Sequence, residues 1–347
     1  MSAVGPLPEG VAPVSGAVPA SDPGAGAVLR ERARSEAERA ARHAGVRITL
    51  LETPGELAEA EEVLRRVWGA RPTDSSIATA AMMRAIGHAG GYVAGVRADP
   101  AAGAPLVGVC VGFCAAPAEL SLHSHVAGLV EASVGHGAGR ALKLDQRAWA
   151  LEHGLTSITW TYDPLVSRNA YFNLHRLGAH LAEYLVDFYG PLEDGVNTGE
   201  PSDRALVRWA LDDPRVLALA AGHSGRAGAR ARWSPGPGTG SGGSGDAPWR
   251  GSDGIEEGTP EPTVLLTEGS HGEPRPGAVT AEALLEDAAG RALVAAPDDI
   301  EGLRHRDPAA AHAWRFALRG AMLPLLEHGW EVAGFARGRG YLIERDR

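Results

Sequence analysis

Residues 122–144 read LHSHVAGLVEASVGHGAGRALKL, the most informative stretch of this sequence. An apolar, strand-like run leads into a glycine-rich turn at 135–139, and a helical pattern follows from Arg140. Glycine adopts positive φ and lets a ligand approach the backbone closely. The first amides of a helix have no partner within it and lie at the positive end of its dipole. The stretch therefore predicts a strand–turn–helix unit that binds a phosphate or diphosphate group.

The rest of residues 46–211 alternates between strand and helix patterns. Apolar or β-branched runs are found at 46–52, 92–97, 106–115, 120–130, 156–162, 179–188 and 205–211. Runs with apolar residues at helical spacing are found at 53–68, 76–88, 137–153 and 167–177. These two periodicities distinguish strands from amphipathic helices. The order predicts an α/β fold in which helices cover the faces of one mixed sheet.

Composition divides the chain into four parts. Residues 1–45 are rich in Gly, Pro, Ala and Arg and predict a disordered or solvated tail, and 46–221 form the main domain. Residues 222–262, which contain PGPGTGSGGSGDAP, have the composition of a flexible linker. Residues 263–347 form an αβ piece with few large apolar side chains. Because so small a piece makes a poor core of its own, we expect it to dock on the main domain.

The overall composition excludes several classes of protein. A net charge of −10 argues against a chain-wide phosphate-binding surface, so nucleic acid is not an expected partner. The sequence has no apolar run long enough to cross a membrane and no signal-peptide pattern at its start, which predicts a cytoplasmic location without membrane attachment. Cys110 and Cys114 form no Cys-x-x-Cys pair and are expected to be reduced core residues.

Two other phosphate-binding motifs are alternative interpretations of the glycine turn. A Walker loop requires Gly-Lys-Ser/Thr, whereas Gly139 is followed by Arg140 and Ala141. A dinucleotide-binding turn usually comes early in its unit, with an acidic residue at the end of the next strand. Asp163 stands at about that distance, but several strands precede the turn and Pro164 follows directly. A nucleotide-binding oxidoreductase therefore remains the weaker alternative.

The turn is similar to the acetyl-CoA-binding motif of the GNAT superfamily of N-acyltransferases, which usually reads Gln/Arg-x-x-Gly-x-Gly/Ala. Gly137 and Gly139 occupy the small positions, and Val134 occupies the Gln/Arg position. The resemblance implies acyl-CoA as co-substrate. Its implied contacts are Leu129, Val134, Gly135, His136, Gly137, Ala138, Gly139 and Arg140 on and around the turn, and Asn169 in a later helix.

Longer strings carry a narrower resemblance. GRALKLDQRAWALEHG, TWTYDPLVSRNAYFNLHRLGA, YLVDFYG and, further on, AWRFALRGAM and GRGYLIE are similar to a GNAT subgroup, some of whose members are thought to be amino-acid N-succinyltransferases. This implies a mostly antiparallel central sheet with a C-terminal αβ extension. It also implies transfer of an acetyl or succinyl group to the amine of a small molecule, with an amino acid favoured. An inactive acyl-CoA-binding module is the alternative, and the oligomeric state stays open between monomer and homodimer.

The family mechanism implies a gap between the strands at 122–130 and 156–162, with the pantetheine lying in it. His123 and His125, two apart on a strand, share a face, and either is a candidate base. They are alternatively a half-buried structural pair. No further ligand stands at zinc-like spacing, so no metal is expected. The position that often protonates the departing thiolate falls on Leu174, which leaves Tyr171, one turn earlier, as a substitute candidate.

Three residues are candidates for substrate binding. Asp163 follows a strand, where it is predicted to orient the amine or to form an Asx turn. Arg168 opens the next helix and is a second candidate. Arg315, four residues before Arg319 on a helix, is predicted either to hold a carboxylate of the acyl group or acceptor, or to lie on a solvated helix face.

Overall fold

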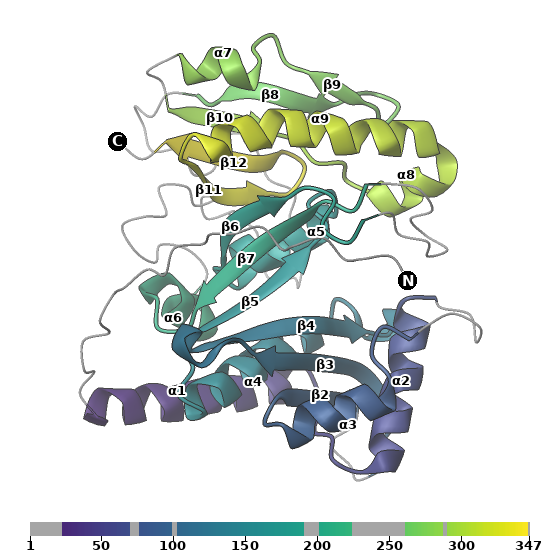
Figure 1. Cartoon of the computed structure of the whole chain (residues 1–347), viewed down its shortest axis with the longest axis vertical. Coiled ribbons are helices and arrows are strands. Elements are labelled where there is room, and N and C mark those ends of the chain that lie inside the picture. The colour runs from purple at the N-terminus through teal and green to yellow at the C-terminus, as the bar shows by residue number, and fades with distance from the viewer. Residues whose placement is uncertain are drawn as a thin grey trace, which may run out of the picture.

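The computed structural model of the chain describes residues 23–69, 76–98, 103–190, 201–223, 261–286 and 290–345. Two sheets with helices packed on them account for most of these residues (Figure 1). The predicted linker at 222–262 falls almost wholly outside the described ranges, as do the first 22 residues of the predicted tail. The expected α/β class is confirmed, because the main domain is one mixed sheet between helices and the C-terminal piece adds a second αβ layer.

The first sheet has seven strands in the order β1-β2-β3-β4-β5-β7-β6. All its neighbours pair antiparallel except β4 and β5, which are parallel. The strands are β1 (Arg47–Leu50), β2 (Tyr92–Arg97), β3 (Leu106–Cys114), β4 (Ser121–Leu129), β5 (Ser157–Tyr162), β6 (His180–Leu185) and β7 (Arg204–Ala210). Because β7 lies between β5 and β6, residues far apart in sequence become cross-strand neighbours.

Helices on this sheet begin at recognisable caps. In α2 (Pro54–Val67), Thr53 and Glu56 form a reciprocal capping box with Pro54 at the first position. The helix α3 (Ala80–His88) begins at Thr79, whose side chain accepts from the Met82 amide. The remaining helical segments are α1 (Pro23–His43), α4 (Ala138–Glu152), α5 (Ser167–Ala170), the π-helical turn η3 (Tyr171–Arg176), α6 (Pro214–Ala220) and the short turns η1 (Pro117–Glu119) and η2 (Glu131–Ser133).

Helix α1 corrects the prediction that residues up to 45 form a solvated tail. Ala33 and Ala37 are buried against α4, where small side chains let the two helices approach closely. Glu36 and Arg147 form an ion pair of 3.1 Å in which each side chain is 1% exposed. The predicted tail rested on the lack of large apolar residues in this segment. A helix that packs through alanines and one buried ion pair has no such residues and is therefore missed.

The second sheet has the order β11-β12-β10-β8-β9 and is crossed by one long helix (Figure 1). Its elements are β8 (Thr263–Glu268), β9 (Pro274–Pro276), α7 (Ala281–Leu285), β10 (Arg291–Val294), α8 (Ile300–Arg306), α9 (Pro308–Glu327), β11 (Trp330–Ala336) and β12 (Gly340–Arg345). Asp307 caps α9 with Pro308 at its first position, and the helix continues past Pro324 to Glu327.

The C-terminal piece packs on the first sheet through buried side chains. One apolar core runs through both, and β11 lies beside β6 and η3 (Figure 1). The Tyr341 hydroxyl donates to the Pro164 carbonyl at 2.7 Å, and Ser167 Oγ donates to the Pro297 carbonyl at 2.6 Å. These contacts fix the loop that follows β5, which is one wall of the site described next.

Candidate functional site

The parallel strands β4 and β5 separate within their own length. They pair only from Ser121 and Ser157 to His123 and Thr159. Beyond that point β4 continues to Leu129 and β5 to Tyr162, and the two diverge (Figure 1). We call the place where they part, just after His123 and Thr159, the fork. Unpaired strand edges offer N–H and C=O groups to an extended ligand.

A β-bulge lies in β4 at the fork. Val111 pairs with Val126 but Gly112 pairs with Ser124, so His125 is the extra residue. The rings of His123 and His125 lie 5.3 and 5.9 Å from that of Phe113, on the same side of the sheet. His123 is half-buried and His125 is exposed. The two candidate bases therefore border the fork together, in different surroundings.

His123 is held in place by a partner on the opposite strand. Its Nδ1 lies 3.2 Å from Thr159 Oγ1. Burial disfavours the charged imidazolium and lowers the pKa of His123 below 6.5, and the positive charges of His125 and Lys143 lower it further. The ring is therefore neutral at pH 7 and able to accept a proton.

The glycine turn lies at the C-terminal end of β4. Gly135 and Gly137 have φ of 89° and 87°, which side-chain-bearing residues rarely adopt. Helix α4 begins at Ala138. Its N-cap residue is Gly137, and no side chain accepts a hydrogen bond from the first amides of the helix. Val134 and His136 are exposed, so the described neighbours leave the turn open. The first amides of α4 are thus available to an anion.

Three other predicted cofactor contacts are more constrained. The side chain of Arg140 points away from the glycine turn and toward the end of α6. Its guanidinium donates to the carbonyls of Leu219 and Ala220 at 2.7 and 3.1 Å. Leu129 is half-buried beside the turn, with Cδ1 3.5 Å from where a Cβ on Gly139 would lie. Asn169 is half-buried in α5, and its N–H donates to the Val166 carbonyl at 2.9 Å.

Tyr171 begins the π-helical turn η3 and is engaged by its neighbours. Its ring stacks on His175 at 4.7 Å, and the guanidinium of Arg337 lies 4.5 Å from the ring centre. Burial, together with Arg215 and other cations, lowers the pKa of His175 to about 4. Leu174, three residues further along the chain, is buried. Tyr171 is therefore tied to the second sheet.

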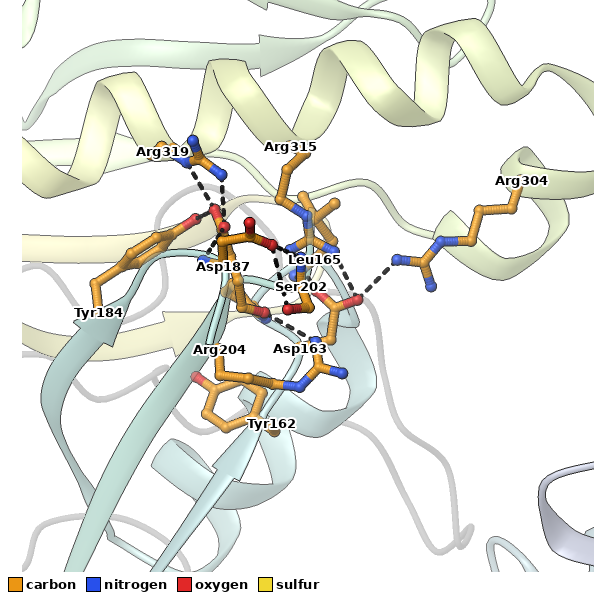
Figure 2. Close-up of polar contacts among 12 residues, drawn as sticks. Tyr162, Asp163, Leu165, Tyr184, Asp187, Ser202, Arg204, Arg304, Arg315 and Arg319 are labelled. Carbon is orange, nitrogen blue, oxygen red and sulfur yellow. Dashed lines mark hydrogen bonds and ion pairs between the residues drawn. The ribbon is translucent and has the colours of Figure 1, made fainter. Parts of the chain in front are cut away.

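The predicted substrate residues Asp163 and Arg315 bind each other (Figure 2). Their two hydrogen bonds measure 2.8 and 2.9 Å, and Arg304 adds a third to Asp163 at 2.7 Å. Burial alone would raise the pKa of Asp163, but the two guanidinium groups outweigh it and hold the pKa well below 3.8. The Leu165 amide also donates to Asp163 at 3.0 Å, which is the Asx turn given as the alternative.

All three residues predicted to bind substrate make ion pairs within the chain. Arg315 is 1% exposed and takes its carboxylate from within the chain, so it presents no open face to a substrate. Arg319 likewise binds Asp203 at 2.9 and 2.6 Å. Arg168 is exposed but makes a two-bond ion pair with Glu301 of α8. All three pairs join the first sheet to the second, and the sequence could not reveal them because each spans more than 100 residues.

A row of polar residues that the sequence did not reveal crosses the sheet beside the fork. His123 pairs with Thr159, Thr159 with Arg208, and Arg208 with His180, across β4, β5, β7 and β6. Arg208 is exposed and makes no hydrogen bond or ion pair within the described part of the chain. Its place in the row depends on the insertion of β7 between β5 and β6, which no local pattern predicts.

A second missed feature lies on the opposite face of the sheet, under the fork. The Lys143 ammonium donates to Ser124 Oγ at 3.1 Å and to Gln146 Oε1 at 2.8 Å. It also lies 3.8 Å from the centre of the Trp160 ring. All four residues are buried. A buried cation of this kind is a candidate functional group.

The ranges that the structure describes hold no cluster of three or more His, Cys, Asp or Glu side chains able to bind a metal. No helix within those ranges is long and apolar enough to cross a membrane.

The chain matches no family model and no curated protein. Among solved structures it is similar to a Salmonella typhimurium protein described as an acetyltransferase and solved with acetyl-CoA, at 16% identity and a TM-score of 0.38, over 49% of this chain and 95% of that one. A ribosomal-protein-S5-alanine acetyltransferase from Vibrio fischeri aligns at 16% identity and 0.39, over 49% and 94%. An N-acetyltransferase from Staphylococcus aureus aligns at 14% and 0.37, over 48% and 99%. Scores this low carry no functional conclusion, so the function is inferred from the geometry of this chain.

Proposed function

We propose that this chain is a GNAT-type N-acyltransferase that moves an acetyl or succinyl group from acyl-CoA to the amine of a small molecule. The observation that carries the proposal is the fork between β4 and β5, which opens toward an uncapped glycine turn. The glycine turn fits the diphosphate of coenzyme A, and the gap between the strands fits its extended pantetheine chain.

The residues of the turn fit the diphosphate. The amides of Ala138 and Gly139 precede the first helical bond, which runs from the Ala141 N–H to the Gly137 carbonyl. Val134 contributes no side-chain donor, so backbone amides must supply most of the binding. His136, exposed in the turn, is the nearest replacement for the missing side-chain donor.

The thioester would lie in the fork with its carbonyl toward β4. A backbone N–H between Ala127 and Leu129 would polarise that carbonyl and stabilise the oxyanion that forms on attack. The attacking amine must first lose a proton. His123 fits this role because its ring is neutral at pH 7 and fixed by Thr159, whereas His125 is an exposed second candidate.

The acceptor would approach from the face that carries the histidines. Arg208 lies two strands from His123 in the same row, which is about 10 Å at ordinary strand spacing. An arginine at that distance can hold a carboxylate while the amine of the same molecule reaches the base. This supports an amino acid as acceptor.

One alternative has specific support. Val134 and Leu174 both depart from the family pattern, which favours an acyl-CoA-binding protein without turnover. A cytoplasmic monomer or homodimer is compatible with either function.

Calorimetry combined with a thiol-release assay tests the proposal. We expect acetyl-CoA or succinyl-CoA to bind and to release thiol when D- or L-amino acids are added. His136→Asp places a negative charge in the turn and should weaken binding about fivefold, since a charge near a helix N-terminus is worth about 1 kcal/mol. His136→Ala is the matched control. Binding without thiol release by any acceptor would favour the inactive alternative, and no binding at all would contradict the proposal.

A further inference from the structure

Lys143 is the only lysine in this sequence. The chain has 33 Lys and Arg residues, and the other basic side chains, on every face and in every buried ion pair described above, are arginines. Arginine stays protonated in proteins, whereas the lysine amine can lose and regain a proton at accessible pH. The buried position under the fork therefore carries the one Lys or Arg side chain of this sequence that can transfer a proton at such pH.

The position of Lys143 is tied to the fork by register. His123 and Thr159 are the last residues at which β4 pairs with β5, so Ser124 and Trp160 are the first residues of the two strands that do not pair with each other. Lys143 reaches up from α4 and contacts both, donating to Ser124 Oγ at 3.1 Å and lying 3.8 Å from the centre of the Trp160 ring. Its ammonium thus lies directly below the point where the strands separate.

The surroundings of Lys143 do not neutralise its charge. An ammonium has three N–H donors, and Ser124 and Gln146 use two of them. Within the described residues Lys143 has no carboxylate partner and no third acceptor. Burying such a cation costs free energy, and that cost is typical of functional sites rather than of cores. The third N–H has no hydrogen-bond acceptor among the described residues, and the ammonium lies against the ring of Trp160, at the edge of the fork.

Building on the proposed function, we infer that Lys143 is the acid that protonates the departing CoA sulfur. In this step the acceptor nitrogen forms its bond to the acyl carbon, the C–S bond breaks, and its electron pair goes to sulfur. The proton moves from Lys143 Nζ to that sulfur, which leaves as a neutral thiol. The proton lost by the amine goes to His123 or to water, and Lys143 regains a proton from solvent, so acyl-CoA and amine give amide and free CoA.

The groups around Lys143 are consistent with a cation that can give up its proton. Burial lowers the pKa of Lys143 to about 8, and Cys110 on β3 opposes this only in part. His123 on β4 lies on the other face of its strand, and β5 contributes the uncharged Trp160. On α4, Asp145 is occupied by Arg34 of α1, at 2.8 Å, and by the Tyr92 hydroxyl, at 2.7 Å. At pH 7 the ammonium form is therefore present and ready to donate.

Lys143→Met tests the inference because methionine fills similar space without a proton. We expect the native chain to lose activity as pH rises through about 8, when Lys143 becomes neutral, and Lys143→Met to lack that descending limb. Its kcat should fall about 100-fold, the size typical of a lost general acid. The Kd for CoA, measured by calorimetry, should stay unchanged. An unchanged kcat with the descending limb intact would overturn the inference.

Ser124→Ala is the matched control, since it removes a contact of Lys143 but keeps the ammonium. It should retain the descending limb, and loss of the limb in this variant too would point to a structural role of the network and overturn the inference. If the native chain turns over acyl-CoA and Lys143→Met equals it, only the inference fails. If the native chain neither binds nor consumes acyl-CoA, the proposed function fails as well.

Discussion

Asp163, directly after β5, accepts two hydrogen bonds from Arg315 in α9, 152 residues further along the chain. The pair ties the second sheet to one wall of the fork (Figure 2). Because Arg304 binds the same carboxylate, Asp163 holds two elements of the C-terminal piece, α8 and α9. The C-terminal extension therefore supports the site mechanically, whatever it contributes to substrate binding.

Replacing Asp163 by Asn should be strongly destabilising. The change keeps the shape of the side chain but leaves Arg315 as a buried, unpaired cation, which costs about 3–5 kcal/mol. Urea denaturation at pH 7 measures the loss. Because the pKa of Asp163 is lowered in the folded state, its contribution is present above about pH 4 and is lost as the pH falls below that. The difference between the two proteins should therefore shrink in acid.

The exposed pair between Arg168 and Glu301 serves as the comparison. Arg168→Met should change the free energy of unfolding by less than about 1 kcal/mol, because both side chains are largely in water. If Asp163→Asn and Arg168→Met lower the free energy of unfolding equally, burial does not set the strength of these ion pairs.

Lys143→Met should stabilise the protein even though it impairs turnover. A pKa held at about 8 instead of 10.5 corresponds to about 3 kcal/mol of destabilisation by the ammonium at pH 7. Since the folded pKa is the lower one, the native chain gains stability as the pH rises from about 8 toward 10.5, and the advantage of the variant disappears over that window. Urea denaturation at pH 7 and pH 10 checks both statements.

The same lysine offers a direct measurement. Because Lys143 is the only lysine, labelled lysine gives a single NMR signal whose titration reports its pKa. A midpoint near 8 is expected, and a midpoint near 10.5 would mean that the side chain is hydrated rather than buried.

His123→Ala should reduce kcat more than His125→Ala does. A positioned base typically contributes about 100-fold or more, and His123 has the fixed contact to Thr159 that His125 lacks. Because burial lowers its pKa, the native chain should keep its activity below pH 6.5 until His123 is protonated. Steady-state rates from pH 5 to 8 test this, and equal, full activity in both variants would remove the histidines from the mechanism.

Arg208→Met should raise KM for an amino-acid acceptor about tenfold or more while leaving KM for acyl-CoA unchanged, because a charged hydrogen bond is worth about 1.5–3 kcal/mol. Arg275→Met, a change of another exposed arginine in the second sheet, is the control. An equal rise in KM when the acceptor is an amine without a carboxylate would contradict a role for Arg208 in holding that group.

Local sequence signals account for the unit from Leu122 to Leu144. Glycines at positive φ, the strand before them and the helix after them follow from residues adjacent in the chain, and the structure has them where they were predicted. The bulge at His125 was not predictable in this way, because it is defined by pairing with β3.

Long-range pairing explains what sequence reasoning missed. Asp163 and Arg315 were each predicted to bind substrate, because the neighbouring sequence does not show that these two side chains bind each other. Arg208 acquires its neighbours only from the strand order. Lys143 is different, because its uniqueness is visible in the sequence and marks it without any structure.

The end of α1 has a practical consequence for how this protein is expressed. A Cβ on Gly137 would lie 3.6 Å from the Cβ of Ala44, so the first helix ends against the glycine turn. A truncated protein starting at Val46, the boundary that composition suggests, would lack Ala44. It would also lack Glu36, which leaves the buried Arg147 without its ion-pair partner. Recombinant versions should therefore start before Pro23, or poor solubility and weak acyl-CoA binding will be mistaken for properties of the intact protein.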